Sequence, residues 1–211
     1  MKPEVAAKPE YWDKAKRALA RRDPVMGAII RAHPTVFMVR RGEAFMTLAR
    51  AICGQQISVK AAQAVWNRLV LCCSEMTPQK VLSKKRTELR ACGLSDRKTE
   101  YIADLAQHFA DGKIHEHRWP AMSDEEIIDE LVDVRGIGRW TAEMFLMFNL
   151  LRPDVFPLDD LGLQKGLRAS YFRNRSVSLK RMKALGETWR PWRSVATWYL
   201  WRSLDPIPVE Y

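Results

Sequence analysis

Signals that start helices recur along this chain, whereas signals that start strands do not. Asp23-Pro24 pairs a good N-cap residue with proline at the first helical position, and Thr77-Pro78 repeats the pattern. Ser123 and Glu126 have the spacing of a capping box ahead of the apolar run IIDELVDV. Alternating strand patterns and Asn-Gly hairpin turns are essentially absent. The sequence therefore predicts an all-α fold of many short helices. We expect these helices to begin near Pro24, Ala44, Ser58, Thr77, Ser95, Ser123, Arg139, Ser178 and Pro191.

The charge of the chain favours an acidic partner. Its 211 residues carry a formal net charge of +10, with a pI of about 9.7. Nucleic acid is the commonest partner of so basic a protein, although a basic surface with no specific meaning is an open alternative. The first residues do not resemble a secretory signal, and no apolar run approaches the length of a membrane span. We therefore expect a soluble intracellular protein with no membrane partner.

Several cysteines and tryptophans are expected to pack in the hydrophobic core rather than to bind a cofactor. The four cysteines form no Cys-x-x-Cys pair and have no histidine at metal-ligand spacing, so neither zinc nor an iron–sulfur cluster is predicted. Reduced, mostly buried thiols are the expected state. The residues expected to pack inside are Cys53, Cys72, Cys73, Cys92, Trp12, Trp66 and Trp189.

A Gly-Ile-Gly turn stands at the entrance of an apolar helix, in VDVRGIGRWTAEMF. Gly136 and Gly138 allow positive φ and the close approach of another backbone, while Ile137 can pack into the core. Backbone N–H groups after the turn would point outward at a helix N-terminus, which suits a DNA phosphate, with Arg139 and Thr141 beside it. The alternative is an ordinary hairpin of two helices whose glycines only permit tight packing.

The inner side of the same turn could hold a cation. The backbone carbonyl groups of Val132, Val134 and Gly136 are the expected ligands of a sodium or potassium ion that bridges to the phosphate. No other cofactor is expected.

Four stretches together resemble one family. LVDVRGIGRWTAEM resembles the helix-hairpin-helix of the DNA glycosylase superfamily that carries a Gly/Pro-rich loop and a catalytic aspartate. VFPLDDLGLQKGL resembles the loop and helix that bear this aspartate, and RPWRSVATWYLW resembles the last helix of the alkylation-repair branch, the 3-methyladenine DNA glycosylase II type. LARAICGQQISVKAAQAVWNRL resembles the helix-loop-helix that the family presses into the minor groove. These stretches cover most of residues 44–204.

The resemblance implies a two-lobed helical fold without the N-terminal β-rich domain that some relatives carry. Residues 44–154 would form a central lobe that includes the helix-hairpin-helix, at about 124–150. Residues 1–43 and 155–211 would form the second lobe, with the catalytic loop.

The resemblance assigns the catalytic role to Asp160, and it leaves Asp159 as a cap or a solvated neighbour. From the residues alone, either carboxylate could simply cap the following helix. Cleavage of an N-glycosidic bond builds positive charge on the deoxyribose, and a nearby carboxylate stabilises that charge. Whether Asp160 acts as a general base or as an electrostatic stabiliser is left open here.

The base pocket implied by the resemblance is aromatic. Trp140 stands where bifunctional relatives carry the lysine that forms a Schiff base, so we expect no lyase activity and an abasic product. Trp201 is the second aromatic of the pocket, and Met144 replaces a tyrosine that is frequent in the family. Alkylation at N3 or N7 makes a purine cationic, and stacking on an indole then contributes about 0.5–2 kcal/mol.

The wedge that fills the gap left by a flipped nucleotide is Gln56 by the same resemblance. The neighbouring Gln55 is interpreted as structural, bonding loop backbone. The alternative is that both glutamines only stabilise their loop.

The expected activity is hydrolysis of the bond between deoxyribose and an alkylated purine, 3-methyladenine or 7-methylguanine, in double-stranded DNA. The protein would act as a monomer in base excision repair, in a bacterial-type cytoplasm or a eukaryotic nucleus. Two alternatives stay open: a glycosylase for mismatched adenine, hypoxanthine or an oxidised base, and a helix-hairpin-helix protein that binds DNA without catalysis.

Overall fold

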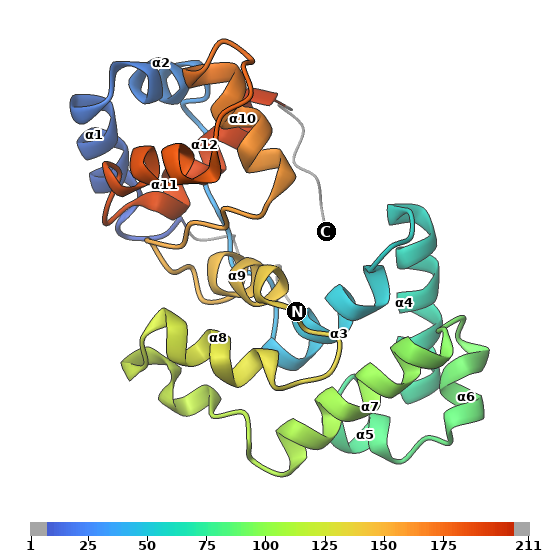
Figure 1. The fold of residues 1–211 in the computed structure, drawn as a ribbon. Coiled ribbons are helices and arrows are strands. Elements are labelled where there is room, and N and C mark those ends of the chain that lie inside the picture. The colour runs from blue at the N-terminus through green and yellow to red at the C-terminus, as the bar shows by residue number, and fades with distance from the viewer. Residues whose placement is uncertain (1–7, 205–211) are drawn as a thin grey trace. The chain divides into compact units, whose positions relative to one another are not determined.

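The computed structural model describes residues 8–204, which form helices and connecting loops with no strand among them (Figure 1). The all-α prediction is confirmed. The elements are α1 (Trp12–Arg22), α2 (Pro24–Ala32), α3 (Ala44–Gly54), α4 (Val59–Cys73), α5 (Pro78–Leu82), α6 (Arg86–Ala91), α7 (Asp96–Ala110), the 3₁₀ helix η1 (Glu116–Ala121), α8 (Asp124–Val132), α9 (Arg139–Phe148), α10 (Leu161–Tyr171), α11 (Leu179–Glu187) and α12 (Arg193–Leu204).

The predicted caps form as side-chain hydrogen bonds. Asp23 accepts a hydrogen bond from the Met26 amide at the start of α2, and both halves of the Ser123–Glu126 capping box are made at α8. The last helix begins at Arg193 rather than Pro191, because the chain turns between Trp189 and Trp192 before it enters the helix. Within the described range, no helix combines the length and the apolar character needed to cross a membrane.

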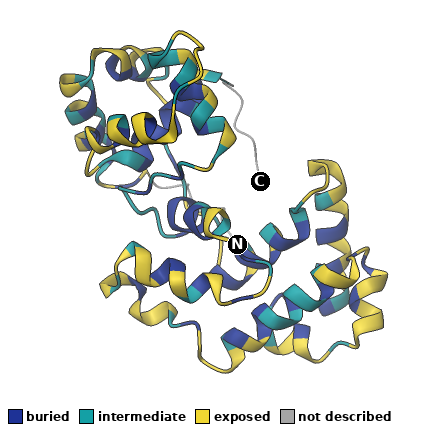
Figure 2. Cartoon of the chain, in the orientation of Figure 1, coloured by how far each residue is buried: buried dark blue, intermediate teal, exposed yellow. Residues whose placement is uncertain are grey.

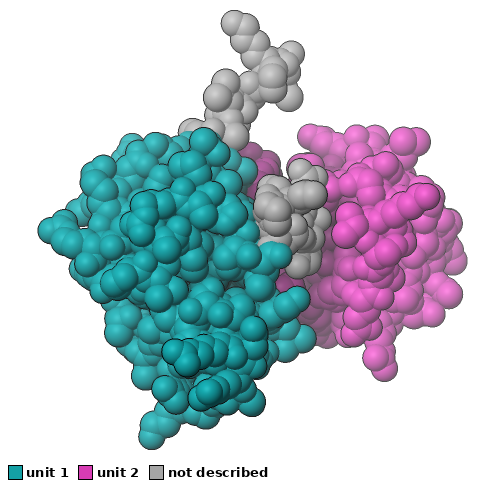
Figure 3. Space-filling view, turned by 90° about the horizontal axis from the view of Figure 1, so that it is seen from above, with its two compact units in different colours: residues 1–40, 146–209 teal, residues 41–145, 210–211 magenta. Residues whose placement is uncertain are grey.

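The chain divides into two compact units (Figure 3). Among the described residues, unit 1 consists of 8–40 and 146–204, and unit 2 of 41–145. The boundaries therefore follow Arg40 and Phe145, compared with 43 and 154 in the sequence-based division. The second boundary falls inside α9.

Unit 1 is built around α12, which packs against α10, α2 and α1. Seven consecutive residues of α12, from Ser194 to Leu200, are buried, and so is Arg202, so this helix is covered on all sides (Figure 2). Trp12 and Trp189 are fully buried as predicted, and both Trp189 and Tyr171 donate hydrogen bonds to Asp23. The N-cap of α2 thus also joins distant parts of the unit.

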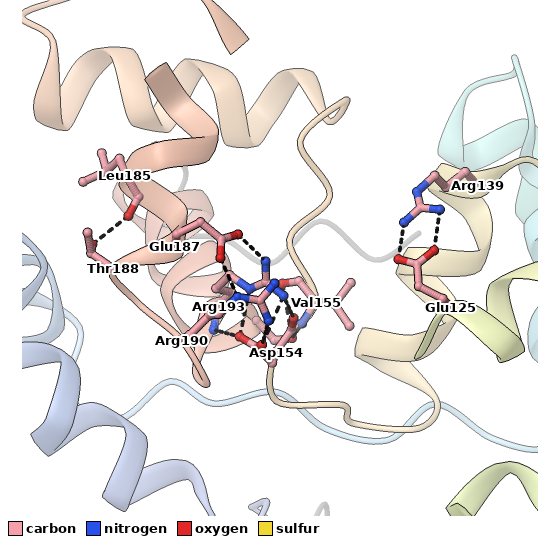
Figure 4. Close-up of polar contacts among 10 residues, drawn as sticks. Glu125, Arg139, Asp154, Val155, Leu185, Glu187, Thr188, Arg190 and Arg193 are labelled. Atoms are coloured by element: carbon pink, nitrogen blue, oxygen red, sulfur yellow. Dashed lines mark hydrogen bonds and ion pairs between the residues drawn. The ribbon is translucent and has the colours of Figure 1, made fainter. Parts of the chain in front are cut away.

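Polar contacts anchor the loop that leads from α9 to α10 (Figure 4). Arg193 donates to both the carboxylate and the carbonyl oxygen of Asp154, at distances from 2.8 to 3.1 Å. The Ser194 hydroxyl accepts from the Val155 amide at 2.8 Å and donates to the Arg152 carbonyl at 2.6 Å. These bonds hold the start of the loop that ends at Asp160.

Unit 2 centres on α7, which packs against α3, α5 and α6. Trp66 and three cysteines, Cys53, Cys73 and Cys92, are buried, and Cys72 is half-buried, which confirms the prediction of mostly buried thiols. Burial raises the pKa of the Cys53 thiol to about 12, so this thiol is protonated and unreactive near neutral pH.

Candidate active site

The Gly-Ile-Gly turn links α8 to α9, as the sequence predicts, but its two glycines do different things. Gly136 has a φ of +87°. A Cβ atom there would lie 2.2 Å from Cδ2 of Tyr101, so the turn requires glycine for its conformation and for contact with a side chain, not with another backbone. Gly138 has no positive φ, and an added Cβ would meet nothing within 4 Å. The expectation of a positive φ is therefore wrong for Gly138. Ile137 is buried, as expected.

Arg139, expected beside a bound phosphate, is engaged within the protein (Figure 4). Its guanidinium donates to both carboxylate oxygens of Glu125, at 2.6 and 2.8 Å, and to Glu143 at 3.2 Å. Hydrogen bonds from Arg139 hold the pKa of Glu125 below its ordinary value. Arg139 thus ties the start of α9 to α8.

Two of the three carbonyl groups expected to hold a cation already accept hydrogen bonds. Gly136 accepts a hydrogen bond from the Gln55 side-chain amide at 2.8 Å, and Val134 accepts one from the Ile137 amide at 3.1 Å. In the part of the chain that the structure describes, no group of three or more His, Cys, Asp or Glu side chains could hold a metal ion.

Asp160, expected to be catalytic, is the N-cap of α10. Its Oδ1 accepts from the Leu163 amide at 2.6 Å and from the indole Nε1 of Trp201 at 2.8 Å. Asp159 is exposed. Of the two roles left open for Asp159, the solvated neighbour fits its exposure, and the cap belongs to Asp160. An N-cap position is one where a helix stabilises negative charge.

The carboxylate of Asp160 is held by close packing as well as by hydrogen bonds. Trp201 stacks on Phe148 with ring centroids 5.9 Å apart. A Cβ atom on Gly162 would lie 3.0 Å from Oδ1 of Asp160 and 3.2 Å from the Trp201 ring. Glycine at 162 therefore lets the indole reach the carboxylate. Sequence reasoning missed this role of Gly162, and it assigned Trp201 to the base pocket without its hydrogen bond.

Replacing Trp201 with phenylalanine is expected to slow base release at least tenfold. The change keeps an aromatic ring against Phe148 but removes the donor to Asp160, and a hydrogen bond to a charged group contributes about 1.5–3 kcal/mol. Single-turnover release of the base measures the effect. Trp192→Phe is a matched control, since its indole stacks on Tyr11 instead. Equal rates in the Trp201→Phe variant and the wild type would show that the indole does not orient the carboxylate.

The residues that the sequence analysis assigns to a base pocket lie on two helices. Trp140 and Met144 lie one turn apart on α9 in unit 2, and Trp201 lies on α12 in unit 1. Trp140 is 40% exposed although its side chain is large and apolar. Such an indole suits contact with a ligand, and a lysine nucleophile is absent from its position.

The wedge candidate lies at the tip of the loop between α3 and α4. Gln56 is exposed and has a φ of +57°, in the left-handed region that residues other than glycine seldom adopt. Strain of this kind is common at functional sites. Gln55 bonds backbone as interpreted, but the backbone belongs to the Gly-Ile-Gly turn, 81 residues further along the chain.

The net positive charge of residues 8–204 lies in one unit. Among the described residues, unit 1 has 19 Lys and Arg against 7 Asp and Glu, whereas unit 2 has 15 against 15. Long-range attraction of a polyanion therefore comes from unit 1. A phosphate at the turn in unit 2 would be held by local backbone geometry rather than by excess charge.

Comparison with known proteins agrees with this geometry. Residues 49–191 match the family model described as HhH-GPD superfamily base excision DNA repair protein. The chain is 34% identical over 169 residues to DNA-3-methyladenine glycosylase 1 of Schizosaccharomyces pombe, which covers 78% of this chain and 74% of the relative.

Two solved structures have the same fold. The DNA-3-methyladenine glycosidase of Bacillus halodurans superimposes with a TM-score of 0.85 at 31% identity, covering 91% of this chain and 89% of the other. The 3-methyladenine DNA glycosylase Mag1 of Schizosaccharomyces pombe, in complex with abasic DNA, gives 0.76 at 31% identity, covering 94% and 98%. The chain therefore belongs to the HhH-GPD superfamily of base excision DNA repair proteins, in the branch of the DNA-3-methyladenine glycosylases.

Proposed function

We propose that this protein is a monofunctional glycosylase that hydrolyses the N-glycosidic bond of alkylated purines in double-stranded DNA. The observation that carries the proposal is the Asp160 carboxylate, fixed at a helix N-terminus by the Trp201 indole. A DNA-binding module has no use for an oriented acid, since a carboxylate repels the phosphate backbone. The names of the relatives support 3-methyladenine as the first substrate to test.

The reaction needs a bond from a water oxygen to C1′ of deoxyribose and loss of the base, which leaves with the electron pair of the glycosidic bond. Positive charge on the sugar is greatest when this bond is nearly broken. A carboxylate held in one orientation stabilises that charge without having to reorganise, which is why we assign this role to Asp160. A cationic alkylated purine is a good leaving group, so protonation of the base by an acid is not required.

The remaining roles are those that the family resemblance implies. Trp140 and Met144 receive the flipped base, with Trp201 as the second aromatic of the pocket. Gln56 fills the gap in the duplex, and the backbone from Gly136 to Thr141 binds a phosphate. Because Trp140 replaces the lysine nucleophile, the product is an abasic site in an unbroken strand. We further propose that the protein acts as a monomer on intracellular DNA.

A monovalent cation at the turn is part of the proposal. The carbonyl groups of Val132, Val134 and Gly136 are the proposed ligands, since a carbonyl oxygen has two lone pairs and can accept one hydrogen bond while it also binds a cation. Replacing potassium by tetramethylammonium at equal ionic strength is expected to weaken binding of duplex DNA. Unchanged affinity would rule out a role for a small cation.

The test of the proposed function is release of free bases from methylated duplex DNA, separated by chromatography, with strand cleavage scored in the same reaction. Methylated purines released from intact strands would support the proposal. Strand breaks without added alkali would show a lyase nucleophile other than Trp140. No release despite binding would contradict the substrate assignment and would favour another lesion or a non-catalytic role.

A further inference from the structure

One face of α7 contacts both loops that the proposed function assigns to DNA. Lys98, Tyr101, Asp104 and His108 follow one another at spacings of three, three and four residues, which places them along one side of a helix. All four are at most half-exposed. Sequence reasoning missed this row, although polar residues at helical spacing beside the buried Ile102 and Leu105 are visible in DRKTEYIADLAQHFA.

The first residue of the row holds the wedge loop. The Lys98 ammonium donates to the backbone carbonyl oxygens of Cys53 and Gln55, at 2.8 and 2.6 Å. These carbonyl groups lie at the C-terminal end of α3, where a positive charge is favourable. Burial lowers the pKa of Lys98, which fits a cation drawn out of water to bind backbone. The left-handed Gln56 follows directly after the second carbonyl.

The other three residues hold the Gly-Ile-Gly turn. The Tyr101 ring packs on Gly136. The Asp104 carboxylate accepts from the backbone amide of Arg135 at 2.9 Å and from its side-chain Nε at 3.1 Å. His108 Nε2 lies 3.2 Å from the carboxylate of Asp133 at the end of α8. The turn is thus fixed to α7 at Gly136 itself and at two positions before it, Asp133 and Arg135.

Gln55 joins the two loops directly. Its backbone carbonyl accepts from Lys98, and its side-chain amide donates to the Gly136 carbonyl at 2.8 Å. A closed path therefore runs from Lys98 through Gln55 to Gly136, then to Tyr101 and back along α7. All of these residues lie in unit 2.

We propose that α7 is a positioning helix that makes the wedge loop and the phosphate-binding turn one rigid body, with Lys98 and Gln55 as the linking residues. Flipping a nucleotide from a duplex costs a few kcal/mol, part of which an inserted side chain recovers. To recover this free energy, the wedge loop and the phosphate-binding turn must stay at a constant distance from each other. The roles of the two loops rest on the proposed function, but the mechanical link does not.

Hydrogen exchange measured by mass spectrometry tests the link without any DNA. Lys98→Met keeps an unbranched chain but loses both hydrogen bonds to the wedge loop. We expect amide exchange to accelerate at residues 54–58 and also at 134–138, which Lys98 does not touch. Lys98→Arg should restore much of the protection, and Lys60→Met is a matched control on the exposed side of α4. Faster exchange at residues 54–58 alone, or at neither segment, would overturn the proposal.

A second variant covers the case in which Lys98→Met does not fold. Gln55→Leu removes the side-chain bond to Gly136 and leaves both backbone carbonyl acceptors of Lys98 in place. It is expected to accelerate exchange at residues 134–138 with little change in the melting temperature. Unaltered exchange there would overturn the role of Gln55 as the link.

Excision from two DNA substrates tests what the link does. One substrate has the alkylated purine in a fully paired duplex, and the other has it in an unpaired bubble, where flipping costs little. We expect Lys98→Met and Gln55→Leu to slow excision from the duplex about tenfold, equivalent to about 1.4 kcal/mol, and from the bubble less than about twofold. Equal losses on both substrates, or no loss on either, would overturn the positioning role.

The hydrogen-exchange and excision experiments together distinguish a failure of this inference from a failure of the proposed function. If the wild type releases no alkylated purine from either substrate, the proposed function fails, and the exchange experiment still decides whether α7 links the loops. If the wild type is active and the exchange at 134–138 does not respond to either variant, the link fails and the proposed function stands.

Discussion

Replacing Asp160 by asparagine is expected to abolish base release while DNA binding persists. The amide oxygen of asparagine can still accept from the Leu163 amide and from Trp201, so the cap of α10 and the stack on Phe148 are retained. What disappears is the negative charge that would face the developing positive charge on the sugar. Loss of one preorganised electrostatic partner lowers a rate by about 100–1,000-fold, and loss of a full charge belongs at or above the upper end of that range.

Single-turnover release of 3-methyladenine from duplex DNA measures this effect, with binding followed on a duplex that contains an abasic-site analogue. Asp159→Asn is the matched control, because it removes the same charge from the adjacent, exposed position. Binding by the Asp160→Asn variant should equal or exceed that of the wild type, since a charge that repels phosphate has gone. If activity survives in the Asp160→Asn variant and falls in the Asp159→Asn variant, Asp159 is the catalytic residue and Asp160 is not.

Replacing Gly136 by alanine is expected to destabilise unit 2 and to abolish DNA binding at the turn. The new Cβ would lie 2.2–2.8 Å from three atoms of the Tyr101 ring, and the backbone has a φ of +87°. A left-handed conformation costs a residue with a Cβ about 1–2 kcal/mol, and overpacking adds about 1–3 kcal/mol. The sum, about 2–5 kcal/mol, is a large share of the stability of a typical domain. Urea denaturation gives the loss of unfolding free energy.

Gly138→Ala separates stability from binding at the same turn. Its Cβ would meet nothing within 4 Å, and its φ is not positive, so the unfolding free energy should change by less than about 0.5 kcal/mol. If a DNA phosphate approaches the backbone there, the affinity for DNA should nevertheless fall. A Gly136→Ala variant as stable as Gly138→Ala would contradict the packing of Tyr101 on the turn.

A double variant divides the cost at Gly136 into its two parts. In a Tyr101→Leu background the smaller, flexible side chain can move, so Gly136→Ala should lose only the conformational part of about 1–2 kcal/mol. An undiminished cost in that background would mean that Tyr101 does not contribute to it.

Local features of this protein were predictable from its sequence. The capping box of Ser123 and Glu126 and the N-cap at Asp23 form as predicted, because each involves residues within three positions of one another. Ile137 and the tryptophans at positions 12, 66 and 189 are buried, because apolar area drives them out of water whatever their neighbours are. The all-α class follows from the same local patterns, whereas the family was identified through the resemblance of four stretches of sequence.

The partners of polar side chains were decided by the tertiary structure. Trp201 reaches Asp160 across 41 positions, and Gln55 reaches Gly136 across 81. Arg139 donates to both carboxylate oxygens of Glu125 on the preceding helix, 14 positions away. A polar group can bond with several partners of similar energy, and only the packing of the helices decides which one lies at the right distance and angle. The difference between Gly136 and Gly138 was also decided by the tertiary structure. A glycine is required only where another part of the chain comes close or where the backbone is left-handed, and of these two glycines only Gly136 meets both conditions.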